Sequence, residues 1–210
     1  MILATLLSHI FQIEFSYAIV IGILFSIFYI YSGGFKAVIR TDKIQFILMY
    51  SGFLILFLYL FFSYGGINFL ITNVPSKNLT LTGNLPIGYI LSWSIISMVT
   101  FIDPSIFQRT YSSDNETILK KGIVISILFW FIFDILSISI GIYASALIDI
   151  KTLNDFNPYL YLADNFLPTF IKNIFLISLL SVVMSTIDSF FLVSSMLVTN
   201  NLLENKEFII

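Results

Sequence analysis

The chain has 210 residues, of which 10 are Lys or Arg and 12 are Asp or Glu, so 10% of its positions carry charge. A soluble globular domain has about 25% charged residues. With 58% apolar residues and a mean hydropathy of +0.98, the chain is too apolar for a soluble enzyme domain, a coiled coil or a disordered tail. It has no cysteine, which excludes thiolate metal sites, and a formal net charge of −2 without a large basic cluster argues against a nucleic-acid partner. We therefore expect a protein of the lipid bilayer.

Five apolar stretches are long enough to be transmembrane helices. A helix needs about 20 mostly apolar residues to cross the bilayer core. The runs are too long and too uniformly apolar for the strands of a β-barrel, which favours an all-α, polytopic membrane protein. Residues 1–10 lack the basic start and cleavage site of a signal peptide and are expected to end another helix. The predicted spans, within a single domain of residues 1–210, are 16–31, 42–63, 86–108, 122–147 and 168–200.

The distribution of basic residues indicates the orientation of these spans, because cytoplasmic loops are enriched in Lys and Arg. The loops 64–85 and 148–167 hold few cations and are too short and polar to be folded domains. We expect a multi-pass protein of the plasma (inner) membrane with a cytoplasmic C-terminus. The residues assigned to the cytoplasmic side are Lys36, Arg40, Lys43, Arg109, Lys120, Lys121 and Lys206, and those on the other side are Lys77, Lys151 and Lys172.

The last predicted span combines acidic and hydroxyl side chains where they are costly. A carboxylate near the bilayer midplane costs about 2.5–3.5 kcal/mol, so Asp188, and Asp134 in the preceding span, are expected to face protein or water. Protonated acids or acids with a purely structural hydrogen bond are the alternatives. Four serines at spacings of three, four and four fall on one helical face beside Asp188. Their oxygens suit a small hard cation such as Na⁺, or they only join packed helices. These serines are Ser178, Ser181, Ser185 and Ser189.

Two further segments contain residues that commonly end or begin helices. Gly33-Gly34 can end one helix, and Thr41 or Asp42 can cap the next by accepting a hydrogen bond from its free amides. Asp103-Pro104 interrupts the third span, since proline removes a helical hydrogen bond. The interruption is either a simple kink or backbone that lines a cavity.

Three segments in this order resemble the sodium:solute symporter family, which includes proline, pantothenate and sugar transporters. They are YSGGFKAVIRTDKIQF at 31–46, FIDPSIFQRTYSS at 101–113 and SVVMSTIDSFFLVSSMLVTNNL at 181–202. The resemblance implies two inverted five-helix repeats of the leucine-transporter type, with the five spans corresponding to core helices four to eight. It also implies that the chain is a fragment, whose partners include the missing core helices of the same transporter.

The same resemblance implies the cation sites. The family's principal Na⁺ site corresponds to the hydroxyls of Ser185 and Thr186 and the carbonyl of Val182, with its other ligands on the first core helix. A second cation site, found in some members, corresponds to Asp42, Asp188 and Ser189. Na⁺ is then the coupling ion, and no cofactor is expected.

The solute site is expected near the midplane of the third span, where Trp93, Ser97 and Thr100 fall on one face and lead towards Asp103. Sugar-transporting members carry a Tyr-Trp pair where this chain has Val99-Thr100, which argues against a sugar. The Asp-Pro step is closer to the Gln-Pro step of proline permeases, which favours a smaller solute.

The function indicated by the resemblance is Na⁺-coupled symport of a small organic solute by alternating access, without covalent chemistry. One alternative is an intramembrane hydrolase, in which Asp134 and Asp188 come together and activate water. The other is a remnant that interacts with partners and does not transport. His9 is the only histidine, which argues against a Ser/His/Asp triad or a His-based metal site.

Overall fold

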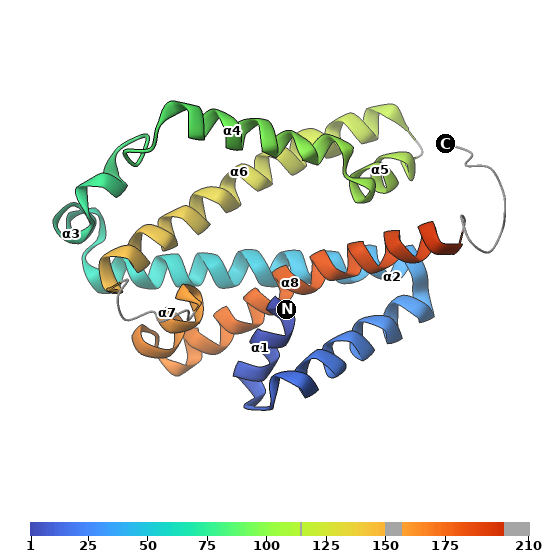
Figure 1. The fold of residues 1–210 in the computed structure, drawn as a ribbon, viewed down its shortest axis with the longest axis horizontal. Helices are drawn as coiled ribbons and strands as arrows, with labels where there is room; N and C mark the ends of the chain where they lie inside the picture. The colour runs from blue at the N-terminus through green and yellow to red at the C-terminus, as the bar shows by residue number, and fades with distance from the viewer. Residues whose placement is uncertain (114, 150–156, 200–210) are drawn as a thin grey trace. The chain divides into compact units, whose positions relative to one another are not determined.

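The computed structural model describes all residues except 114, 150–156 and 200–210, and it leaves the side chains of 29, 32 and 33 undescribed. The described part is helical and contains no strand, as the all-α prediction requires (Figure 1). In chain order, the helices are α1 (Ile2–Phe11), α2 (Phe15–Tyr64), α3 (Gly66–Asn73), the 3₁₀-helix η1 (Ser76–Leu79), α4 (Ile87–Ser97), the 3₁₀-helix η2 (Met98–Ile102), α5 (Pro104–Tyr111), α6 (Glu116–Leu147), α7 (Pro158–Phe166) and α8 (Thr169–Val198).

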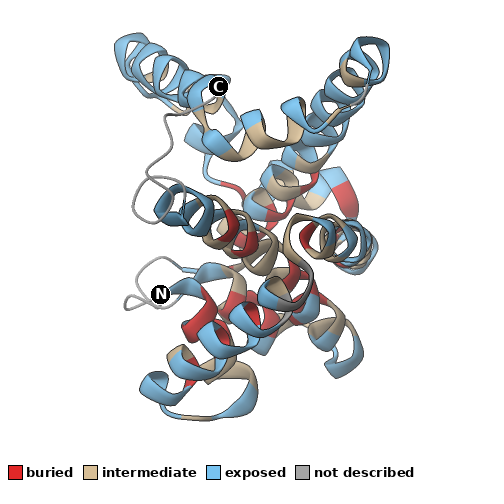
Figure 2. Cartoon of the chain, turned by 90° about the vertical axis from the view of Figure 1, so that its right-hand side faces the viewer, coloured by how far each residue is buried: buried red, intermediate tan, exposed pale blue. Residues whose placement is uncertain are grey.

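Three helices are long and apolar enough to cross a membrane unaided: Gly34–Tyr64, Glu116–Leu147 and Thr169–Val198. Two bent pairs bring the number of candidate spans among the described residues to five. The helix Ile2–Phe11 meets Phe15–Phe28 at 112°, and Ile87–Ile102 meets Pro104–Tyr111 at 44°. Exposed residues predominate along these helices, and buried residues form short patches (Figure 2). Many of the exposed residues are large and apolar. This is the pattern of helices that present most of their surface to lipid.

The chain divides into two compact units, and the first combines residues 1–52 with 173–210. In its described part, this unit contains α1, residues 15–52 of α2 and most of α8. Gly22 of α2 lies against α1, since a Cβ there would be 2.8 Å from Leu3 Cδ2. Gly52 of α2 lies against α8 in the same way, because a Cβ there would be 2.6 Å from Ser178 Oγ and 3.2 Å from the Ile174 carbonyl oxygen.

The second unit, residues 53–172, contains the end of α2, helices α3 to α7 and the short helices η1 and η2. Its core is aromatic: Phe53 lies 4.8 Å from Phe133 between ring centroids, and Phe69 stacks on Tyr143 at 6.1 Å. The hydroxyl groups of Ser137 and Tyr159 join α6 to α7 at 3.1 Å. These contacts hold α6 against α3 and α7, while α4 keeps most of its side chains exposed.

The second long helical segment begins earlier than the sequence predicted. Gly34 has φ 53° and ψ −146°, a conformation that only glycine adopts readily, and it separates two helical segments within α2. Because helix continues from Gly34, the prediction that Thr41 or Asp42 caps a helix is wrong. Thr41 lies inside the helix and donates to the carbonyl oxygens of Ala37 and Val38 at 3.2 and 2.9 Å.

The interruption predicted at Asp103-Pro104 is present. Asp103 has an extended backbone between η2 and α5, and its Oδ1 accepts hydrogen bonds from the Ser105 amide at 2.7 Å and the Ser105 hydroxyl at 2.5 Å. The carboxylate therefore caps α5, whose first residue is the proline.

Candidate functional site

Two of the predicted cation-binding residues of α8, Ser185 and Asp188, contact α2, which α8 crosses in the antiparallel direction. Ser178 of α8 lies against Gly52, and Ser185, further along α8, contacts Asp42, which is earlier in α2. All of these residues belong to the first unit. Ser178, Ser181 and Asp188 are buried, and Ser185 is half-buried. The serine face of α8 therefore points into the protein.

The serines of α8 make two kinds of hydrogen bond: three of them bond within α8, and one bonds to α2. Ser178, Ser181 and Ser189 donate to carbonyl oxygens one turn back in α8, at 2.7, 2.9 and 3.0 Å. Such bonds satisfy the hydroxyl within its own helix. Ser185 instead donates to Oδ1 of Asp42 across the crossing, at 2.7 Å. This bond joins one residue of each predicted cation group.

Asp188 is fully buried, with 0% of its side chain exposed. Its Oδ2 accepts a hydrogen bond from Nε2 of Gln45 at 3.4 Å. Gln45 lies one turn after Asp42 on α2, and Asp188 lies one turn after Ser185 on α8. The crossing thus gathers two carboxylates, an amide and hydroxyl groups from two helices. A low-dielectric environment strengthens the attraction of such oxygens for a cation.

The other predicted cation-binding residues of α8 are half-buried or exposed. Thr186 is exposed in this chain, and its hydroxyl donates to the Val182 carbonyl oxygen at 3.2 Å. Val182 and Ser189 are half-buried. The structure therefore brings Asp42, Ser185 and Asp188 together at the crossing. Ser189 is half-buried one turn after Ser185, and Thr186 lies on the side of α8 that the described residues leave open.

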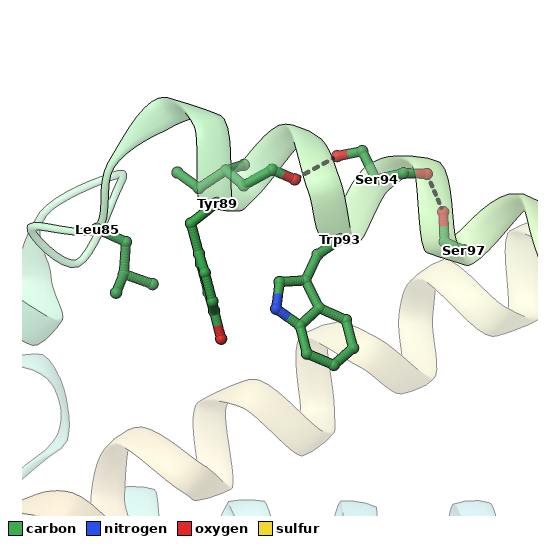
Figure 3. Close-up of a pocket in the computed structure, with 6 residues that line it drawn as sticks. Leu85, Tyr89, Trp93, Ser94 and Ser97 are labelled. Atoms are coloured by element: carbon green, nitrogen blue, oxygen red, sulfur yellow. Dashed lines mark hydrogen bonds between the residues drawn. The ribbon is translucent and has the colours of Figure 1, made fainter.

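The predicted solute residues divide into two pairs. Trp93 and Ser97 line an open cavity of about 420 Å³ along α4, with Tyr89 one turn before the indole (Figure 3). Trp93 is 56% exposed and meets Tyr89 edge-on at 6.2 Å between ring centroids. Thr100 and Asp103 lie beyond the cavity, in η2 and at the bend, where the Asp103 carboxylate is engaged as a cap.

The serine hydroxyls of this cavity are already used within α4. Ser94 donates to the Ile90 carbonyl oxygen at 3.0 Å, and Ser97 donates to the Ser94 carbonyl oxygen at 2.7 Å (Figure 3). Their oxygens keep lone pairs that can accept a hydrogen bond from a solute. The two aromatic rings supply an apolar surface beside them.

Two further positions concern the predicted polar residues. Asp134 is exposed in α6 beside exposed apolar residues such as Trp130 and Ile138, and its facing protein or water stays a prediction. Gln45, which the sequence analysis did not select, contacts Asp188. Its spacing of three from Asp42 matches that of Ser185 and Asp188 and was the available signal. Among the described residues, no group of three or more His, Cys, Asp or Glu side chains is placed to hold a metal ion.

Comparison with known proteins gives one match. A sequence model of the sodium:solute symporter family matches residues 2–206. No curated protein and no solved structure matches the chain.

Proposed function

Because the chain belongs to the sodium:solute symporter family, we propose that it takes part in Na⁺-coupled transport of a small organic solute and binds Na⁺ at the crossing of α2 and α8. The observation that carries this proposal is the 2.7 Å hydrogen bond from Ser185 to Asp42. It places an ionisable carboxylate beside a hydroxyl of the Ser-Thr pair, on the buried side of two candidate membrane spans.

The principal Na⁺ site comprises the hydroxyls of Ser185 and Thr186 and the carbonyl of Val182. The Ser185 hydroxyl donates a hydrogen bond to Asp42, so the lone pairs of its oxygen stay available for a cation. The exposure of Thr186 leaves room for further ligands, which the family places on another helix. The open side of α8 supports this assignment, because a helix that packs there would complete the coordination shell.

The second cation site comprises Asp42, Asp188 and Ser189. A buried carboxylate is costly unless it is paired or binds a cation. Asp188 is fully buried at the helix crossing and accepts a hydrogen bond from Gln45, and its carboxylate oxygens are ligands of the kind that a hard cation takes. The shared contact between Ser185 and Asp42 connects the two sites, so occupancy of one changes the electrostatic environment of the other.

The solute binds along α4 near Trp93 and Ser97, where an aromatic wall and hydroxyl oxygens line a cavity. Thr100 and Asp103 remain candidates at the end of this span, where Asp103 also shapes the bend by capping α5 through its Oδ1. Na⁺ binding favours the transport state that binds solute well, which couples the ion gradient to uptake. We place the protein in the plasma membrane with its C-terminus on the cytoplasmic side.

The two alternative functions, an intramembrane hydrolase and an interaction protein, require different features of the structure. A hydrolase needs two acids that share a proton around water, and Asp134 lies on an exposed face of α6. An interaction protein that does not transport needs no cation-dependent behaviour. Saturable Na⁺ binding therefore favours the transport function over an interaction protein that does not transport.

The test is Na⁺ binding by the purified protein, measured as Na⁺-dependent thermal stabilisation and as ²²Na⁺ binding, with choline replacing Na⁺ at constant ionic strength. We expect saturable binding, and we expect Ser185→Ala and Thr186→Ala each to raise the half-saturating Na⁺ concentration about tenfold. Ser195→Ala is the matched control on α8, because its hydroxyl only bonds the Leu192 carbonyl oxygen. An unchanged Na⁺ dependence in both site variants would contradict the assignment.

A further inference from the structure

The crossing of α2 and α8 contains a paired arrangement that includes a residue outside the predicted sites. Asp42 contacts Ser185, and Gln45 contacts Asp188. Each pair takes one residue from each helix, and the two residues from one helix are three positions apart and share a face. Gln45 thus lies one turn from Asp42 on α2 and in contact with Asp188 of α8.

The amide of Gln45 is only partly used by the protein. Its Nε2 donates to Asp188 Oδ2 at 3.4 Å, at the long end of the hydrogen-bond range. Its Oε1 is buried and has no hydrogen-bond partner. The opposite orientation of the amide would bring two oxygens together, so the N–H group belongs next to the carboxylate. In this orientation the carbonyl oxygen is the atom of the amide that lacks a hydrogen-bond partner.

A buried carbonyl oxygen without a partner costs about 1–3 kcal/mol. A glutamine retained only to orient Asp188 would have a donor for this oxygen or expose it to water. A hard cation removes the cost, because amide carbonyl oxygens are ligands for such ions. The unsatisfied oxygen lies on the side chain that also touches the buried carboxylate, where the proposed cation would sit.

We infer that Gln45 belongs to the second cation site: its N–H group positions Asp188, and its carbonyl oxygen is a ligand of the ion. This inference rests on the proposed function, since it concerns the same Na⁺ site. The oxygen donors of the site are then the carboxylates of Asp42 and Asp188, the amide of Gln45 and the hydroxyl of Ser189.

Substitutions at position 45 separate the ligand from the packing of the side chain. Gln45→Met keeps a similar length and removes both polar atoms, and Gln45→Glu keeps an oxygen that can bind a cation. Ser51→Ala is the control on the same helix, because its hydroxyl bonds the Leu48 carbonyl oxygen. The probe is Na⁺ alone, by ²²Na⁺ binding and Na⁺-dependent thermal stabilisation of the purified protein.

Loss of a partner that orients a metal ligand weakens binding about 10–100-fold. We expect Gln45→Met to raise the half-saturating Na⁺ concentration of one class of sites at least tenfold. Gln45→Glu should raise it by less, because it keeps an oxygen ligand but loses the N–H group that positions Asp188. Ser51→Ala should bind as the unsubstituted protein does.

The possible results distinguish failure of the role of Gln45 from failure of the proposed function. Unaltered Na⁺ binding in Gln45→Met would overturn the role of Gln45 and leave the proposed function standing. Absence of Na⁺ binding in the unsubstituted protein would overturn the proposed function itself. If Gln45→Met does not fold, Gln45→Glu decides. A folded variant with a shifted half-saturating Na⁺ concentration in one class of sites supports the inference, and a folded variant with both classes unaltered overturns it.

Discussion

Replacement of Gly52 by alanine tests the helix crossing that supports the cation sites. A methyl group there would overlap the Cβ of Ser178 and lie 2.6 Å from its Oγ and 3.2 Å from the Ile174 carbonyl oxygen. Favourable contact between carbon atoms begins at about 3.5 Å, so α2 and α8 must separate by about 1 Å. The Cβ of Ser178 is fixed to its backbone, and rotation of the side chain cannot relieve the overlap.

The expected change in stability follows from two opposing effects. Gly-to-Ala in a helix interior is favourable by about 1 kcal/mol. Overpacking costs about 1–3 kcal/mol, and a collision with a Cβ atom belongs at the upper end of that range. We therefore expect Gly52→Ala to lower the free energy of unfolding by about 1–2 kcal/mol, or the midpoint of thermal unfolding by about 3–6 °C.

The measurement is thermal unfolding of the purified protein in detergent, followed by circular dichroism. Gly141→Ala is the matched control, because Gly141 lies within α6 and a Cβ there would meet nothing within 4 Å. It should unfold at the same temperature or higher. Gly52→Ala combined with Ser178→Gly should recover stability relative to Gly52→Ala alone. A Gly52→Ala variant as stable as the Gly141→Ala control would refute the close approach of the two helices.

Three other substitutions test separate parts of the structure by thermal unfolding. Gly34→Ala should lower the free energy of unfolding by about 1–3 kcal/mol, because alanine is strained at φ 53° although no atom lies within 4 Å of the new Cβ. Asp103→Ala should cost about 1 kcal/mol through loss of the cap on Ser105, and Asp103→Asn should keep most of it. Lys172→Met should cost no more than about 1 kcal/mol, since the 2.6 Å pair with Asp164 is partly exposed, and the difference should shrink in concentrated choline chloride. An unchanged unfolding midpoint for Gly34→Ala, or a lower midpoint for Asp103→Asn than for Asp103→Ala, would contradict the corresponding argument.

Helices and their breaks follow from local chemistry and could be predicted. Apolar runs long enough for a bilayer became α2, α6 and α8, and Pro104 produced the expected break after η2. The start of the second span was missed because Lys36 and Arg40 suggested a loop. In the structure both side chains are exposed, which a helix tolerates, and the positive φ of Gly34 sets the boundary.

Only some residues of the candidate cation site could be predicted from the sequence. The spacing of the α8 serines predicted their common face, and the family resemblance indicated Asp42 as a partner of that face. Gln45 was missed because an uncharged amide inside an apolar helix gives little indication of burial, although its spacing of three from Asp42 matches that of Ser185 and Asp188. Its contact with Asp188 depends on how two helices far apart in the sequence cross, which is tertiary information.

The close approach at Gly52 and the polar contacts around Asp42 belong to one helix pair, and this links stability to ion binding. Along α2, Gln45 lies seven residues before Gly52, or about 10 Å at 1.5 Å per residue. A rigid helix pushed away at Gly52 also moves at Gln45, where the contact with Asp188 is already long at 3.4 Å. Gly52→Ala should therefore weaken Na⁺ binding as well as stability, and Ser178→Gly should restore both. Recovery of stability without recovery of Na⁺ binding would show that the crossing and the cation sites are independent.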